Sequence, residues 1–136
     1  MKLLIYTSAL VAALLRDEAN HAAAVEFLRE SPQARFLLTD LILAETVTLL
    51  RMRVGAARAV AVAHDLRRSR RYEIVFLDRD LLAGALEQMK RYADKRLSLA
   101  DCASFEVMER FRLAAAFTFD QDFRACGFDA APAARH

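Results

Sequence analysis

The chain has 136 residues, of which 56% are hydrophobic and 28% charged, with three glycines and two prolines. This length and composition predict a single compact domain and exclude a largely disordered chain. No signal-peptide pattern opens the sequence and no apolar run approaches the roughly 18 residues that span a bilayer, so we expect a cytoplasmic protein without membrane contact. Cys102 and Cys126 lack the spacing of metal ligands and are expected to be small buried side chains.

The formal net charge is only +2, although the chain is rich in arginine, whose planar guanidinium can bind phosphate through two hydrogen bonds. The densest basic run contains Arg67, Arg68, Arg70 and Arg71. This run could follow a nucleic-acid backbone. Cations at the end of a helix also complement the helix dipole and are normally solvated, and we favour this second interpretation.

The first half of the chain predicts two repeats of a strand followed by two helices. In order, the predicted elements are a strand at 2–6, helices at 9–15 and 21–30, a strand at 35–39 and helices at 41–54 and 56–68. Thr7 or Ser8 can cap the first helix and Asp40 the third, which Gly55 would end. Each strand therefore leads directly into a helix.

Glu45 lies in the helix predicted over 41–54, and the residues around it are apolar on nearly all sides of that helix. We therefore expect the helix to be buried. An ionised carboxylate is tolerated in such surroundings when it is paired or bound to a metal. A metal-binding or catalytic role and a structural ion pair both remain open, and we favour the first.

The second half continues the alternation of strands and helices. It predicts a strand at 72–77, helices at 80–93 and 99–111, and a strand at 113–119 that is buried on both faces. The fold class predicted is α/β, a three-layer α/β/α domain with a central, mainly parallel sheet. We place this single domain at residues 1–129 and expect a loose C-terminal tail at 130–136.

Two further carboxylates lie at positions where a site could form. Ser98 is a good N-cap, which puts Asp101 in the first turn of its helix, and Asp120 follows the carboxyl end of a predicted strand. Ligands of open α/β sheets bind at that edge. Taken singly, each aspartate also has a structural explanation, since acids are favoured at helix starts by the dipole and as helix caps.

Four segments carry a family resemblance that covers essentially the whole chain. They are TSALVAALL at 7–15, LLTDLILAETVTLL at 37–50, RYADKRLSLADCASFEVM at 91–108 and AFTFDQDFRACGF at 116–128. In order and spacing the sequence resembles PIN-domain ribonucleases, specifically the toxins of VapBC toxin-antitoxin modules. The resemblance implies a fold whose acids gather at one sheet edge, bind Mg²⁺ or Mn²⁺ and cleave single-stranded regions of RNA. It also implies a homodimer and a cognate antitoxin protein whose C-terminal segment fills the site.

Carried over by position, the family's acids fall on Glu45, Asp101 and Asp120, and Asp122 is an additional candidate. We assign the first three to catalysis and to the metal shell, directly or through water. Hard divalent cations prefer oxygen ligands, and a metal so held activates water and stabilises charge on phosphoryl oxygens.

The chain departs from the family pattern at Tyr6, where the family has an aspartate directly before Thr-Ser. An uncharged phenol is a poor ligand for a hard cation. Two hypotheses follow: a metal-dependent endoribonuclease toxin impaired by Tyr6, and a noncatalytic homologue that binds antitoxin or RNA without cutting. A receiver-like phosphoacceptor domain is a weaker alternative, because that chemistry needs acids where Tyr6 stands.

Overall fold

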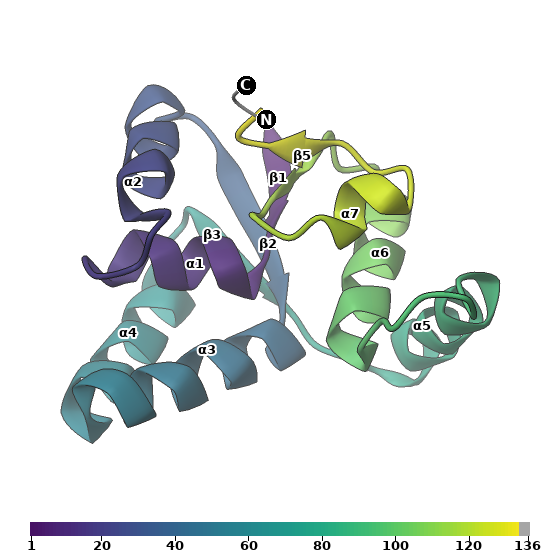
Figure 1. Ribbon diagram of the computed structural model, residues 1–136. Helices are drawn as coiled ribbons and strands as arrows, with labels where there is room; N and C mark the ends of the chain where they lie inside the picture. Colours follow the sequence, from purple (N-terminus) through teal and green to yellow (C-terminus); the bar gives the residue numbers. More distant parts are fainter. Residues whose placement is uncertain (134–136) are drawn as a thin grey trace.

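A computed structural model describes residues 1–133 of the chain (Figure 1). Within these residues the strands form one five-stranded sheet in the order β3-β2-β1-β4-β5, and all neighbouring strands are parallel. The strands are β1 (Lys2–Ile5), β2 (Arg35–Thr39), β3 (Tyr72–Val75), β4 (Ala116–Phe117) and β5 (Ala130–Ala131). The predicted parallel α/β/α architecture is confirmed.

Helices cover both faces of the sheet. They are α1 (Thr7–Leu14), α2 (His21–Glu30), α3 (Asp40–Val54), α4 (Ala56–Arg68), α5 (Arg79–Arg91), α6 (Leu99–Phe111) and α7 (Asp122–Ala125). In Figure 1, α1, α2 and α4 lie on one side of the strands, and α5 and α6 lie on the other. The sheet is therefore the middle of three layers, which explains why its strands are short apolar runs rather than alternating ones.

The core is built around aromatic side chains from the central strands and from α6 and α7. Phe36, Phe105, Phe117 and Phe123 are completely buried. Phe36 and Phe117 pack with ring centroids 5.8 Å apart, as do Phe105 and Phe123 at 5.1 Å. Because β1 pairs in parallel with both β2 and β4, the carboxyl ends of these three strands meet at one edge of the sheet.

Four predicted elements coincide with the structure: the helices at 21–30, 56–68 and 99–111 and the strand at 35–39. The helix starts differ elsewhere. Tyr6, not Thr7 or Ser8, is the N-cap residue of α1, and it makes no side-chain capping bond. Thr39, not Asp40, caps α3, because the Asp40 carboxylate instead accepts the backbone N–H of Leu77 at 3.0 Å.

Helix α1 spans Thr7–Leu14 rather than 9–15, and α3 begins at Asp40 rather than residue 41. The other elements that differ are shorter than predicted, among them β1, which ends at Ile5 rather than residue 6. Helix α5 spans Arg79–Arg91 rather than 80–93, and β3 ends at Val75 rather than residue 77. The strand predicted at 113–119 has only two paired residues, Ala116–Phe117. The apolar character of the flanking residues reflects packing against the core rather than strand pairing.

The C-terminal part contains structure that the sequence did not predict. Ala130 and Ala131, which we had assigned to a loose tail, form the edge strand β5 beside β4. The Arg124 guanidinium holds this segment by donating to the carbonyls of Ala130 and Pro132, both at 3.0 Å. The last part of the expected tail, residues 134–136, lies outside the described residues.

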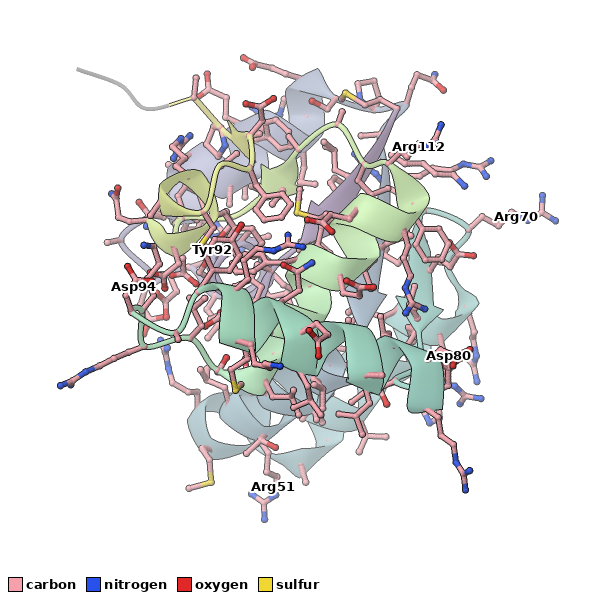
Figure 2. The ribbon with its side chains drawn as sticks, turned by 90° about the vertical axis from the view of Figure 1, so that its right-hand side faces the viewer. Arg51, Arg70, Asp80, Tyr92, Asp94 and Arg112 are labelled. Atoms are coloured by element: carbon pink, nitrogen blue, oxygen red, sulfur yellow. The ribbon has the colours of Figure 1, made fainter. Side chains whose placement is uncertain are left out.

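The arginine run is not uniformly solvated. Arg71 donates to the carbonyl oxygens of Leu28, Ser31 and Ala34, so it ties β3 to the end of α2. Arg70, in contrast, projects into solvent on the same side of the molecule as Arg112 (Figure 2). Our preference for solvated cations is therefore wrong for Arg71.

Both cysteines are free and buried, as predicted. Among residues 1–133, no helix combines the length and the apolar character that crossing a membrane requires.

Gly84 marks the closest approach between α5 and α6. A Cβ atom at this position would lie 2.3 Å from Oε2 of Glu106, which also accepts Nε of Arg110 at 2.8 Å. The other oxygen of Glu106 accepts Nε2 of the buried Gln88 at 3.1 Å. A methyl group at residue 84 would displace a carboxylate that is held from two sides.

We expect Gly84→Ala to lower the free energy of unfolding by about 1–3 kcal/mol, the usual cost of overpacking. In a Glu106→Ala background the same change should instead stabilise the protein by about 1 kcal/mol, because alanine is the better helix former. Urea unfolding of the four proteins measures both values. A loss of stability in both backgrounds would contradict the proposed contact.

Candidate functional site

Tyr6 and Asp101 form a buried hydrogen-bonded pair at the carboxyl edge of the sheet. Tyr6 directly follows β1 and its hydroxyl donates to Oδ1 of Asp101; the two residues are only 6% and 8% exposed. Oδ2 of Asp101 accepts the backbone N–H of Ser98 at 2.8 Å, and the Ser98 hydroxyl accepts the N–H of Asp101 at 3.1 Å. This reciprocal capping box confirms Ser98 as the N-cap of α6 and fixes the carboxylate.

Tyr6 is held as an uncharged phenol. Burial, followed by the hydrogen bond to Asp101 and its negative charge, raises the pKa of Tyr6 well above its ordinary value. The ring also packs edge-on against Phe123 with centroids 5.0 Å apart. The side chain therefore fits its surroundings and contributes a proton donor, not an anionic ligand.

Glu45 reaches the same edge from α3, but it is not buried as predicted. Only Ile42, Thr46 and Leu50 of this helix are buried, and Glu45 is exposed. Its Oε2 accepts the hydroxyl of Thr7 at 2.7 Å. The prediction failed because the apolar sequence of α3 covers a half-exposed surface, so the cost of desolvation was no guide to the role of Glu45.

Asp120 is half-buried beyond the end of β4, on a loop held by hydroxyl groups. The Thr118 hydroxyl accepts the N–H of Asp120 at 3.1 Å, and the Ser8 hydroxyl accepts the N–H of Phe119 at 3.0 Å. The two hydroxyls themselves lie 3.2 Å apart. The loop is thus fixed to the start of α1.

The acids interact electrostatically. Burial, and then the negative charges of Asp101, Asp122 and Glu45, raise the pKa of Asp120 above its ordinary value. The other three predicted carboxylates therefore lie close enough to repel Asp120, although Asp122 itself is exposed at the start of α7. Such a concentration of negative charge is typical of a functional site.

The raised pKa of Asp120 predicts a pH-dependent stability. The folded chain retains this proton when the unfolded chain has released it, so stability should fall as pH rises from the unfolded pKa, near about 3.9, towards the raised folded value. We expect Asp120→Asn to remove this loss and to melt at a higher temperature than the parent at pH 7. The difference should vanish near pH 3. Asp129→Asn is the matched control, and an equal gain there would contradict the repulsion.

Comparisons with known proteins show the family of the chain. Residues 3–129 match the model of the PIN domain family. The chain belongs to the PIN domain family. The 23S rRNA-specific endonuclease VapC20 of Mycobacterium tuberculosis is 33% identical over 111 residues, which cover 82% of this chain and 83% of that protein. Ribonuclease VapC26 of the same organism is 29% identical over 119 residues, or 88% and 87% of the two chains.

The fold of this PIN domain is also found in a solved relative. The crystal structure of M. tuberculosis VapC20, described as a Sarcin-Ricin loop cleaving toxin, superposes with a TM-score of 0.82 at 32% identity. The superposition covers 93% of this chain and 95% of that one.

The donor atoms of the PIN site suit a hard cation, but their arrangement is incomplete. Glu45, Asp101 and Asp120 offer the carboxylate oxygens that Mg²⁺ or Mn²⁺ prefers. Among residues 1–133, however, no three His, Cys, Asp or Glu side chains are arranged to hold a metal ion. At the end of β1 the Tyr6 hydroxyl donates to Asp101, so this position supplies a neutral donor and no carboxylate.

Apart from Ser98, which it identified as an N-cap, our sequence interpretation missed the hydroxyl residues that position the acids. Thr7, Ser8, Ser98 and Thr118 each bond to a carboxylate or to the backbone that carries one. Thr7 and Ser8 were interpreted only as possible helix caps. The signal was present in Thr118, the polar residue of an otherwise apolar segment.

Proposed function

We propose that this PIN domain is a VapC-type ribonuclease toxin that cleaves single-stranded regions of RNA and whose activity is impaired by Tyr6. The named activities of VapC20 and VapC26 and the shared fold support an RNA substrate. The observation that carries the impairment is the hydrogen bond from Tyr6 to Asp101. A neutral donor there leaves the acids without their partner on β1.

We propose that catalysis depends on Mg²⁺ or Mn²⁺. Glu45, Asp101 and Asp120 would hold the ion, directly or through water. When bound, such an ion lowers the pKa of water and stabilises charge on the phosphoryl oxygens. Thr7 orients Glu45, Ser98 orients Asp101, and Thr118 with Ser8 fixes the loop of Asp120. Asp122 adds negative charge from α7.

Two protein partners are part of the proposal: a cognate antitoxin and a second copy of this chain. The antitoxin is supported by the exposed Glu45 within a groove on α3 that Thr7, Ala44 and Leu49 also line. An arginine from a basic segment could bind Glu45 bidentately. A homodimer is supported by Leu82, Leu86 and Met89, which recur at helical spacing and are exposed on α5.

A noncatalytic homologue is the second candidate. It is favoured by one observation, the close fit of Tyr6, whose hydroxyl has a partner and whose ring packs against Phe123. Such a protein would bind RNA or the antitoxin without cutting. Comparing RNA cleavage by the parent chain and by Tyr6→Asp separates the candidates, because only an impaired nuclease gains activity from the missing carboxylate.

A further inference from the structure

A cavity of about 330 Å³ lies beside the acidic site, between α2 and the segment that follows β4. Thr118, Phe119 and Gln121 line it, and Asp120 belongs to the same short loop. The loop that carries Asp120 therefore also forms part of the cavity. Resting on the proposed function, we propose that this cavity binds one unpaired guanine base of the RNA, next to the nucleotide at the acids.

Two aromatic side chains supply a surface on which a base can stack. Phe27 from α2 and Phe119 from the loop line the cavity, and both are half-buried. Both pack against the buried ring of Phe117, with centroids 4.5 Å and 6.1 Å away. Because Phe117 holds both rings, little conformational freedom is lost when a base binds. Unpaired RNA bases are commonly bound by such stacking.

The polar lining selects among the bases. Glu30 lines the cavity from the end of α2, and the carboxamides of Asn20 and Gln121 contribute to the polar lining. An ionised carboxylate only accepts hydrogen bonds, through two oxygens side by side. The N1–H and N2–H₂ groups of guanine form a matching pair of adjacent donors, which adenine, cytosine and uracil lack. The Glu30 carboxylate therefore favours guanine.

The cavity lining also contains a cation that can offset the negative charge of the RNA phosphate. Arg124 borders the cavity and is fixed through the carbonyls of Ala130 and Pro132. Its positive charge offsets the repulsion that Glu26 and Glu30 would exert on an RNA backbone. An aromatic surface, acceptors for the base edge and a cation for the backbone thus surround one cavity next to Asp120, as recognition of a nucleotide requires.

The first test measures the binding of GMP, AMP, CMP and UMP to the parent chain, with NMR chemical shifts as the readout. We expect GMP to bind most tightly and to shift the signals of Phe27, Phe119 and Gln121. Glu30→Gln should weaken GMP binding about 5- to 100-fold, the range for losing a bidentate base contact, and spare the other nucleotides. Phe119→Leu should weaken all four. Glu87→Gln, on the distant helix α5, is the matched control.

The second test is the cut-site profile of Tyr6→Asp on a mixed RNA pool. We expect cuts next to unpaired guanine. In this background Glu30→Gln should reduce the excess of cuts at guanine over cuts at the other bases, whereas Glu87→Gln should leave that excess unchanged. Equal binding of the four nucleotides would overturn the base pocket. So would a cavity that binds a basic antitoxin peptide but none of the four nucleotides. GMP binding without cleavage by Tyr6→Asp would support the pocket and overturn the nuclease proposal instead.

Discussion

Tyr6→Asp should bind Mg²⁺ and Mn²⁺ more tightly than the parent chain and should restore RNA cleavage. The substitution removes a phenol that donates to Asp101 and places an anionic group at the end of β1, beside Asp101 and within electrostatic range of Glu45. Hard cations require such oxygens. We expect the affinity for the metal ion to rise by at least about 10- to 100-fold. Removing even an indirect contact at a metal site lowers the affinity by this factor, so gaining a direct one should raise it at least as much.

The same substitution should destabilise the metal-free protein. Tyr6 is buried and packs against Phe123, so its replacement leaves a cavity and costs about 3–5 kcal/mol, as for other large-to-small changes. The new carboxylate also repels Asp101. Divalent cations should recover part of this loss by binding only the folded state. Calorimetric titration, thermal melts and cleavage of a structured RNA measure these effects together.

Two controls separate charge from shape. Tyr6→Asn opens the same space without adding charge, and it should neither tighten metal binding nor restore cleavage. Tyr6→Asp combined with Asp101→Asn should lose the gain, because the new carboxylate then lacks its anionic partner. If Tyr6→Asp remains folded but neither binds metal more tightly nor cuts RNA, the noncatalytic interpretation replaces the impaired nuclease.

Most of the fold could be predicted because its signals are local. The helix over 56–68 ends in arginines, and the helix at 99–111 begins at Ser98 with its capping box. The short edge strands were not predictable in this way. Ala130 and Ala131 carry no alternation or branched side chains, and they form β5 because β4 and Arg124 hold them there. Long-range contacts, not propensity, determine this part.

The candidate site likewise has features that the sequence predicts and features that depend on long-range contacts. Family position predicted the acids, and their role in a site stays a prediction; the structure places Asp101, Asp122 and Glu45 within electrostatic range of Asp120. Sequence could not show that Glu45 is exposed, because the apolar residues of α3 do not reveal which face the rest of the chain leaves uncovered. Nor could it show that Tyr6 bonds to Asp101, which is 95 residues away in sequence. Both facts depend on packing between elements.

The pair of Tyr6 and Asp101 should contribute strongly to stability as well as limiting metal binding. Asp101→Ala removes a capping partner of Ser98 and leaves the buried Tyr6 hydroxyl without its acceptor. We expect a loss of about 2–4 kcal/mol from these two effects. For a chain of this size, that corresponds to a fall in Tm of about 5–15 °C. Asp101→Asn should stay close to the parent, because it keeps the shape and relieves repulsion with Asp120.

A double-mutant cycle isolates the hydrogen bond itself. Tyr6→Phe keeps the ring against Phe123, and its effect should largely disappear once Asp101→Ala is present, giving a coupling of about 1.5–3 kcal/mol for a bond to a charged group. The ionisation of the Tyr6 phenol also predicts a loss of stability at alkaline pH. Because the folded pKa of Tyr6 is raised, the parent should lose stability as pH rises above the unfolded value of about 10, and Tyr6→Phe should lose less. Additive single effects in urea unfolding would show that Tyr6 acts only through ring packing, and the carboxylate of Asp101 would then be free to take a cation.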